Sequence, residues 1–493
     1  MARLLLFETS TEEQNRLGEQ VNEENESNDV PYPTGLLYLD SILTQKDHTV
    51  RTTDYTFWTE ENCLKEIDKE IKRFKPDIVG ITVLSMTRVS TYKVIKMIKT
   101  LYPKIKIVLG GMHSTMMYEQ LLKNFPIDVI CIGEAEDSFP EVVEALMKNK
   151  NMRSIKGIAY IKNRKLIITE QRKLRTNLDD LPYPNYDAFL TPDKKIVRVL
   201  SSRGCPNRCS YCCLHIISKQ VWRPRSAKSV VDEIEYINKK YPWVEKVQFL
   251  DDIFTLDNQR VIDICKEIIN RNIKLKFTCQ GRVKPVSKEM YRWMEKAGFV
   301  ESLFGIETGS PKLLESIHKG FTQEDILNVF NILKDFKKIK PVKLMMIGFP
   351  GEDEKTVKET IEFSKKLHRI AKMDYFYVNP LWVYPGTEVY QLLKDKGAID
   401  DSYWLSDKPC PIFSLEHDEK WIIKMANKIA IETMLSQGLI FFIFRLIKNF
   451  LSNPKHYFNR LFNKTIQKGI NNQKNKCHHT LKGAVCDSPL FLG

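Results

Sequence analysis

Short apolar runs alternate with amphipathic helical segments along most of this sequence, and that alternation constrains the fold more than any other feature. In the first third, the apolar runs are 3–7, 77–83, 105–109 and 129–132. The helical patterns between and after them are 62–74, 89–101 and 139–147. Strands that are each followed by a helix form parallel sheets with helices packed on both faces. The first third therefore predicts an α/β domain built on a parallel sheet.

Six further strand–helix units occupy the second half of the chain. The strand candidates are 197–201, 247–250, 274–278, 302–306, 342–347 and 375–381. The helical candidates that follow them are 227–240, 259–270, 288–296, 323–336, 354–370 and 388–396. Six units predict a partial (β/α)6 barrel that is open on one side, and functional residues of such barrels lie at the carboxyl ends of the strands.

The segment between these two regions has a different pattern. Runs at 155–161 and 166–169 predict a hairpin, and the prolines of 179–184 predict an extended linker. The predicted domains are 1–147, a hairpin and linker over 148–195, the partial barrel over 196–400, and a helical C-terminal region with a basic tail over 401–493. A chain of 493 residues is long enough for each domain to have its own core.

Eleven cysteines are spread along the chain. The apolar start at 4–7 ends at Glu8, and it predicts a first strand rather than a targeting segment. We therefore expect a cytoplasmic protein in a reducing compartment, where cysteines bind metals or clusters more often than they form a disulfide framework.

Three of the cysteines form a C-x3-C-x2-C motif directly after the first strand of the predicted barrel: Cys205, Cys209 and Cys212. Three thiolates on one loop can ligate three corners of a 4Fe-4S cluster. The fourth iron then has no protein ligand and can bind the amino and carboxylate groups of S-adenosylmethionine (SAM). Two other interpretations stay open: a zinc site completed by Cys213 or His215, and a set of buried, unreactive thiols.

These cysteines and four strand-end motifs resemble the radical SAM superfamily. The motifs are Phe249-Leu250-Asp251-Asp252, Gly305-Ile306-Glu307-Thr308-Gly309-Ser310, Gly348-Phe349-Pro350-Gly351-Glu352 and Tyr384-Pro385-Gly386-Thr387. The resemblance covers most of 196–390. It implies that Tyr211 lies beside the adenine and that Glu307 contacts the ribose or amino group of SAM. Asp251 and Asp252 stand where many relatives have a glycine-rich motif. They would either bind the methionyl amino group or serve as helix-capping charges.

The first domain resembles the Rossmann-like cobalamin-binding domains that precede some radical SAM barrels. The residues that carry this resemblance follow three successive strands: Thr82 and Leu84, then Gly110, Gly111 and His113, then Gly133 and Glu134. The resemblance implies that they surround the nucleotide tail of cobalamin, with His113 in a loop near that tail. The alternative is a Rossmann-like domain that binds no nucleotide.

The familiar D-x-H-x-x-G motif, whose histidine binds cobalt from below, is missing after the first strand. That region reads Glu8-Thr9-Ser10-Thr11-Glu12-Glu13, and the first histidine of the chain is His48. We therefore expect cobalamin to lack a histidine ligand from that site.

The formal net charge of +14 is concentrated in the C-terminal tail, because no acidic residue occurs between Thr433 and Cys486. The apolar run 439–448 is too short to span a bilayer. It could lie in a membrane interface, with the basic residues on anionic lipid. The favoured alternative is a helix packed on the open side of the barrel or in a dimer contact. Cys477, His478, His479 and Cys486 could bind metal, but a flexible tail is the simpler explanation.

These resemblances imply a cobalamin-dependent radical SAM enzyme that generates a 5′-deoxyadenosyl radical. The function expected from them is methylation of an unactivated carbon or phosphorus centre in a small molecule or lipid, with electrons from a flavodoxin or ferredoxin. A cobalamin-dependent oxidative cyclase or rearrangement enzyme is the alternative. A further alternative is an RNA-binding protein with a structural cluster. Nucleic acid is the less favoured partner, because no strand-rich segment follows residue 400.

Overall fold

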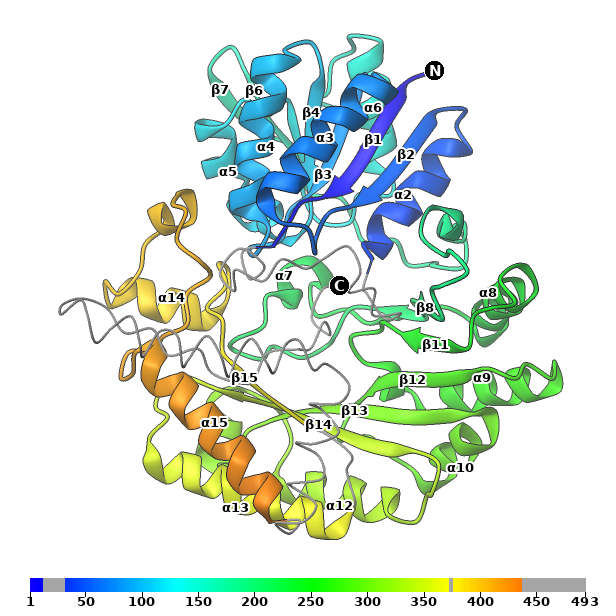
Figure 1. Cartoon of the computed structure of the whole chain (residues 1–493), viewed down its shortest axis with the longest axis vertical. Helices are drawn as coiled ribbons and strands as arrows, with labels where there is room; N and C mark the ends of the chain where they lie inside the picture. The colour runs from blue at the N-terminus through cyan, green and yellow to red at the C-terminus, as the bar shows by residue number, and fades with distance from the viewer. Residues whose placement is uncertain (12–31, 372–375, 437–493) are drawn as a thin grey trace, which may run out of the picture.

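The computed structural model of this chain describes residues 1–11, 32–371 and 376–436. Figure 1 shows two α/β units stacked along the long axis of the molecule, each built on its own sheet. The first sheet has seven strands and the second has six. The predicted fold class is confirmed: a Rossmann-like unit precedes a partial (β/α)6 barrel, and a helical segment follows the barrel.

The seven-stranded sheet has the order β2-β1-β3-β4-β5-β6-β7. Its strands are β1 (Arg3–Glu8), β2 (Thr49–Asp54), β3 (Ile78–Thr82), β4 (Lys106–Gly110), β5 (Val129–Cys131), β6 (Ile158–Lys162) and β7 (Lys165–Ile168). The helices of this unit are α2 (Thr34–Thr44), α3 (Glu60–Phe74), α4 (Arg88–Leu101), α5 (Met112–Asn124) and α6 (Ser138–Met147). Strand β1 lies between β2 and β3, so the strand order reverses there. Open α/β sheets bind their ligands at the carboxyl ends of the strands near such a reversal.

Strand β1 is apolar along its length because hydrophobic clusters cover both faces of the sheet at this strand. Leu5 and Phe7 belong to the hydrophobic cluster on one face of the sheet, whereas Leu4 and Leu6 belong to the cluster on the other face. Successive side chains of a strand point to opposite faces, so a strand that is covered on both sides buries every residue.

Three elements of this unit have weak signals in the sequence: β2, α2 and α5. Strand β2 reads Thr-Val-Arg-Thr-Thr-Asp and, among the described strands, pairs with β1 alone, so its polar residues suit a sheet edge. The predicted hairpin forms as β6 and β7 and extends the first sheet, because β6 pairs with β5 through Ile130 and Ala159. The domain boundaries at 147, 195 and 400 stay predictions.

The six-stranded sheet is parallel and has the order β15-β14-β13-β12-β11-β8, so β8 and β15 are its open edges. Its strands are β8 (Ile196–Val199), β11 (Lys246–Phe249), β12 (Lys276–Gly281), β13 (Phe299–Glu307), β14 (Lys340–Ile347) and β15 (Phe376–Pro380). The helices after them include α8 (Ala227–Lys240), α9 (Asn258–Asn270), α10 (Lys288–Ala297), α12 (Gln323–Leu333), α13 (Glu354–Ile370) and α14 (Glu388–Asp395).

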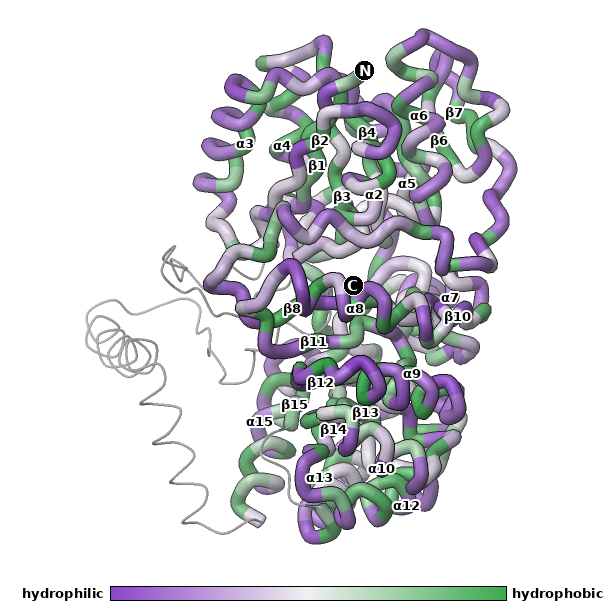
Figure 2. Tube along the Cα trace, turned by 90° about the vertical axis from the view of Figure 1, so that its right-hand side faces the viewer, coloured by the Kyte–Doolittle hydropathy of each residue, from purple (hydrophilic) through white to green (hydrophobic). Residues whose placement is uncertain are grey.

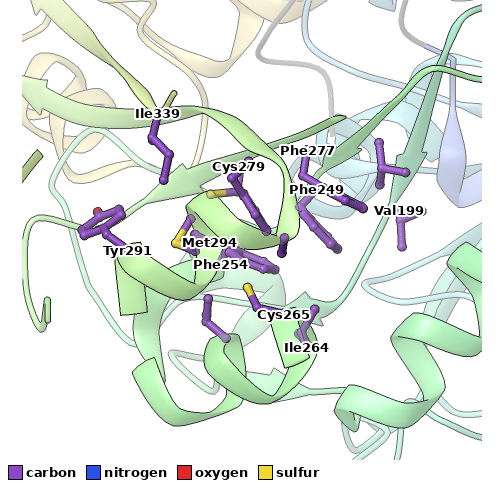
Figure 3. Packing of buried hydrophobic residues seen from close by; sticks show 14 of the residues in the cluster. Val199, Phe249, Phe254, Ile264, Cys265, Phe277, Cys279, Tyr291, Met294 and Ile339 are labelled. Carbon is purple, nitrogen blue, oxygen red and sulfur yellow. The ribbon is translucent and has the colours of Figure 1, made fainter. Parts of the chain in front are cut away.

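Aromatic rings fill the core of the barrel, as Figure 3 shows. The rings of Phe249 and Phe254 stack with centroids 4.3 Å apart, and Phe277 lies 6.1 Å from Phe249. All three side chains are buried. Such stacked pairs stabilise a core beyond the burial of their area. They fix strands β11 and β12, whose carboxyl ends carry part of the site.

Helix α15 (Glu419–Leu435) packs on β14, β15 and α13. Its buried residues include Ile422, Met425 and Ile429. The surface helices of the first unit are amphipathic, and Figure 2 shows the outer side of α3 as mainly hydrophilic. No helix in the described part of the chain is long and apolar enough to cross a bilayer. The apolar run 439–448 and the tail residues Cys477, His478, His479 and Cys486 lie outside the described residues.

Candidate functional site

Two aspartates at the end of β11 hold the start of the cysteine loop. Asp251 is buried and accepts hydrogen bonds from the backbone N–H of Ser201 at 2.7 Å, the hydroxyl of Ser201 at 2.6 Å and the hydroxyl of Ser202 at 2.5 Å. Asp252 accepts from the backbone N–H of Gly204 at 3.0 Å. Neither aspartate caps a helix, because the next helical turn begins at Phe254 and its cap is Ile253.

Gly204 is required at the entry to the cysteine loop. Its φ is +87°, and a Cβ atom there would lie 2.2 Å from the carbonyl oxygen of Val221. Any side chain would therefore displace the backbone that precedes Cys205. The adjacent β9 (Ser202–Arg203) pairs with β10 (Arg223–Pro224) and fixes this end of the loop.

The three motif cysteines are free thiols on this loop, half-buried and near one another. Burial and the neighbouring cysteines together raise the pKa of the Cys212 thiol to about 12, with burial as the larger cause. Burial also raises the pKa of Cys209, which the positive charge of Lys319 opposes. A bound metal deprotonates such thiols outright, so the donor set fits a cluster that supplies its own positive charge.

Hydrogen bonds engage both Cys205 of the motif and His215, the alternative zinc ligand. Asn207 Nδ2 donates to Cys205 Sγ at 3.1 Å, and Arg282 donates to Asn207 Oδ1 at 2.7 Å. His215 Nδ1 lies 2.8 Å from the carbonyl oxygen of Cys212, so that ring nitrogen is engaged with the backbone. Among the described residues, no three His, Cys, Asp or Glu side chains are arranged to hold a single metal ion.

Glu307 ends β13 beside the cysteine loop in a strained conformation, with a φ of +65° and an irregular register after Gly305. Its Oε1 accepts from the hydroxyl of Tyr211 at 3.0 Å and from Lys319 Nζ at 2.8 Å. Its Oε2 is buried and has no hydrogen-bond partner among the residues that the structure describes. An unpartnered buried carboxylate oxygen is costly, so a ligand with an N–H or O–H group would satisfy it. The residues therefore fit the amino group or ribose of SAM.

The edge of the first sheet, where cobalamin is predicted to bind, differs from the barrel edge because glycines rather than charged side chains line it. A Cβ atom added at Gly110 or Gly133 would meet no atom of the described residues within 4 Å, so within this part of the chain both border open space at the carboxyl ends of β4 and β5. At Gly111, with φ of +88°, a Cβ atom would lie 2.7 Å from Thr82 Oγ1. The N–H of Gly133 donates to Thr115 Oγ1 at 3.0 Å. This open edge fits a bulky ligand that approaches the backbone closely.

His113 occupies a different position from the one expected. It lies in the first turn of α5 rather than in a loop, because the helix begins at Met112, and it is fully buried. Its Nδ1 lies 3.0 Å from Ser85 Oγ and its Nε2 lies 3.2 Å from the hydroxyl of Tyr92. Burial lowers its pKa to about 3, so the ring is neutral. Nearby, the N–H of Leu84 donates to Thr87 Oγ1 in the turn after β3.

Glu134 and Glu136 connect the first unit to the cysteine loop. Glu134 forms a two-pronged ion pair with Arg223, and Glu136 lies 2.6 Å from Arg203. Arg203 directly precedes Gly204, so these charges act next to the first cysteine. Two-pronged arginine–carboxylate pairs fix orientation as well as distance. Glu134, predicted to contact cobalamin, is therefore held by the barrel.

Packing between the two units brings their carboxyl edges together. A Cβ atom at Gly386 would lie 2.4 Å from Ile216 in α7 (Leu214–Ser218) and 3.0 Å from the sulfur of Met116 in α5. Figure 1 shows α7 between the two sheets.

The contacts of Lys319, Arg203 and Arg223 have no local signal in the sequence, although Arg203 adjoins the cysteine motif.

The sequence matches two known families. It matches the radical SAM superfamily over residues 199–364 and the B12 binding domain over residues 25–143. An uncharacterized methyltransferase of Pyrococcus horikoshii is 32% identical over 412 residues, which are 82% of this chain and 88% of that protein. An anaerobic magnesium-protoporphyrin IX monomethyl ester cyclase of Rubrivivax gelatinosus is 27% identical over 350 residues, which are 68% of this chain but only 62% of the cyclase.

A solved structure shares the fold of both units. It is the radical SAM methyltransferase TsrM from Kitasatospora setae with cobalamin and a 4Fe-4S cluster bound. Its TM-score is 0.64 at 18% identity, over 88% of this chain and 86% of that chain. The family matches cover the cysteine loop and the glycine edge, so they favour a cluster over zinc and cobalamin over an empty domain. The chain thus belongs to the cobalamin-dependent radical SAM enzymes, whose cofactors are a 4Fe-4S cluster, SAM and cobalamin.

Proposed function

We propose that this enzyme transfers a methyl group from SAM to an unactivated carbon or phosphorus centre of a small molecule or lipid. The observation that carries the proposal is the similarity to the Pyrococcus horikoshii protein, which is named a methyltransferase and matches 82% of this chain. That match spans both units, so it includes the cysteine loop and the glycine edge together.

The arrangement of the two edges supports the proposal. When bound, the cluster and SAM supply the 5′-deoxyadenosyl radical, and cobalamin supplies the methyl group. Glu307 and Tyr211 would hold SAM at the barrel edge, while Gly110 and Gly133 leave room for the cobalamin tail at the other edge. Asp252 is exposed to solvent at this edge, so its carboxylate is a further candidate for the methionyl amino group. Desolvation by the surrounding loop raises its pKa to about 6, and a cationic amino group would favour its charged form.

The contact between the units supports a shared reaction chamber. The ends of the Met116 and Ile216 side chains both lie beside Gly386, which leaves the space that they occupy. The ion pairs of Arg203 and Arg223 with Glu136 and Glu134 tie the cysteine loop to the first unit. A substrate radical must meet the methyl donor within a short distance, and a fixed contact between the two units provides that proximity.

Product analysis tests the proposal. The anaerobically reconstituted enzyme is supplied with reductant, cobalamin and SAM carrying a deuterated methyl group, and then with fractions of small molecules and lipids. With the true substrate, S-adenosylhomocysteine and 5′-deoxyadenosine should form in about equal amounts, and the product should gain the labelled methyl group. Sustained deoxyadenosine formation and substrate turnover without S-adenosylhomocysteine would contradict methyl transfer.

A second candidate is a cobalamin-dependent cyclisation or rearrangement, which the similarity to the Rubrivivax gelatinosus cyclase favours. That reaction would add no carbon to the substrate and would give little S-adenosylhomocysteine, so the same assay separates the two.

The proposed electron source is a flavodoxin or ferredoxin. Contact of the basic tail with anionic lipid remains a proposal, and salt-sensitive binding of the full chain to anionic vesicles would test it.

A further inference from the structure

Lys319 is a largely buried cation beside the cysteine loop. It follows α11 (Pro311–Ser316), and its side chain is 12% exposed. Its Nζ donates to Glu307 Oε1 at 2.8 Å and to the hydroxyl of Tyr211 at 2.9 Å. Lysine is seldom buried unless it is paired with an acceptor. The position of Lys319 is therefore defined by two groups of the SAM site rather than by solvent.

The backbone also fixes Lys319 relative to the cysteines. The N–H of Ser210, inside the cysteine motif, donates to the carbonyl oxygen of Ile317 at 3.1 Å. Gly305 leaves the space that the ion pair occupies, because a Cβ atom there would lie 2.5 Å from Glu307 Oε1 and 3.3 Å from Lys319 Nζ. A lysine ammonium in this pocket thus has little freedom to move away from the loop.

The charge of Lys319 acts on the cysteines that flank Tyr211. Lys319 Nζ donates to the hydroxyl of Tyr211, which stands between Cys209 and Cys212 in the motif, so its positive charge lies beside the loop that carries both thiols. Glu307 carries the opposite charge at the same place. Electrostatic interactions are stronger in a partly buried site than in water. Removing the charge of either Lys319 or Glu307 should therefore change the electrostatic potential at the cysteine loop.

We propose that Lys319 is a positioning residue that raises the reduction potential of the cluster held by Cys205, Cys209 and Cys212. This inference depends on the cluster and not on methyl transfer, so a result that disproves methyl transfer does not affect it. Reduction adds one electron from an external low-potential donor and makes the cluster more negative. A nearby ammonium stabilises the reduced form, whereas the carboxylate of Glu307 opposes it.

A redox titration of the reconstituted full chain without SAM tests the proposal. The paramagnetic resonance signal of the reduced cluster would be followed in wild type, Lys319→Met and Lys319→Arg. Lys319→Met should make reduction about tenfold less favourable, equivalent to about 59 mV for a one-electron couple. Lys319→Arg should stay near wild type, because it keeps the charge. Lys312→Met, which removes an exposed lysine from α11, is the matched control and should have no effect.

The partner carboxylate sharpens the experiment. Glu307→Gln alone should raise the potential, and the double variant Lys319→Met with Glu307→Gln should return toward wild type, because the two charges are removed together. Iron content is measured in every variant. An unchanged potential in fully loaded Lys319→Met would overturn the proposal. Loss of iron from both Lys319→Met and Lys319→Arg would also overturn it in favour of a structural role, whereas loss from Lys319→Met alone would support a requirement for the charge.

Discussion

The carboxyl ends of the strands of the two sheets face each other inside this molecule, and the two sheet edges carry different kinds of residue. The barrel edge carries three thiols, the Glu307–Lys319 ion pair and Asp252, and its ligands would be recognised through charge and hydrogen bonds. The edge of the first sheet carries Gly110 and Gly133 beside open space, and its nearby His113 is neutral and fully buried. A small, charged ligand needs specific polar partners, whereas a bulky one needs space and close access to the backbone.

The contrast explains why the two sites tolerate different changes. At the barrel edge, Glu307, Tyr211 and Lys319 are joined by hydrogen bonds, so a conservative substitution should alter binding without filling space. At the glycine edge, adding volume should matter more than changing charge. Substitutions that keep the fold can therefore separate the two modes of recognition.

The largest expected effect is loss of the cluster. Cys209→Ala removes one of only three thiolate ligands, so stable cluster assembly and SAM cleavage should both disappear. Anaerobic reconstitution with iron and sulfide followed by iron analysis would measure this, with about four irons expected in the wild type. Cys213→Ala is the matched control on the same loop and should keep its iron. Full iron content and SAM cleavage in Cys209→Ala would refute the ligand assignment.

The next effect concerns SAM affinity at the barrel edge. Glu307→Gln keeps the size of the side chain but removes the charge that would face an amino group, so SAM should bind about 10- to 100-fold more weakly. Equilibrium dialysis with the cluster-loaded enzyme would measure this. Glu315→Gln, an exposed change in the adjacent helix, should leave affinity unchanged. Equal affinity in Glu307→Gln and wild type would remove Glu307 from the SAM site.

A change of volume should act at the other edge. Gly110→Val adds a side chain where no atom in the described ranges of the chain lies within 4 Å and where φ is not positive. The fold should therefore persist while cobalamin binding weakens about tenfold or more. Gly35→Val is the matched control, since Gly35 also borders open space but lies in α2. Corrinoid absorbance after gel filtration reports binding. Unimpaired binding in Gly110→Val would mean that the cobalamin tail does not use this edge.

The parts of this structure that the sequence predicts well are those with local signals. The apolar run of β1 and the spacing of the cysteines each lie within a few residues, and both led to the observed strand and loop. Strand β2 carries a polar sequence because it lies at an edge, so it has no comparable signal. The roles of Asp251 and Lys319 depend on partners about 50 and 100 residues away in the chain. Such pairings are set by the tertiary fold and leave no trace in local periodicity.

A second barrel-edge carboxylate offers a contrast with Glu307, because it is buried against backbone amides. Glu352, in the turn after β14, is 2% exposed and accepts from the N–H groups of Gly348 at 2.6 Å and Phe349 at 3.2 Å. Burial raises its pKa from 4.5 to about 7. Between these values the folded state binds more protons than the unfolded state, so the stability contributed by this group is full below pH 4.5 and is lost as the pH rises through 7.

Glu352→Gln should therefore remove a pH dependence rather than an activity. The amide oxygen can still accept from both N–H groups but does not ionise, so the stability of the variant relative to wild type should be greater at pH 8 than at pH 5. The difference should not exceed about 3 kcal/mol, or a few degrees in Tm, which is the smallest of these effects. Thermal unfolding of both proteins at the two pH values measures it, and SAM and cobalamin binding should stay unchanged. If the difference in stability between variant and wild type is the same at pH 5 and pH 8, Glu352 does not titrate in this range, and its burial against backbone amides does not raise its pKa.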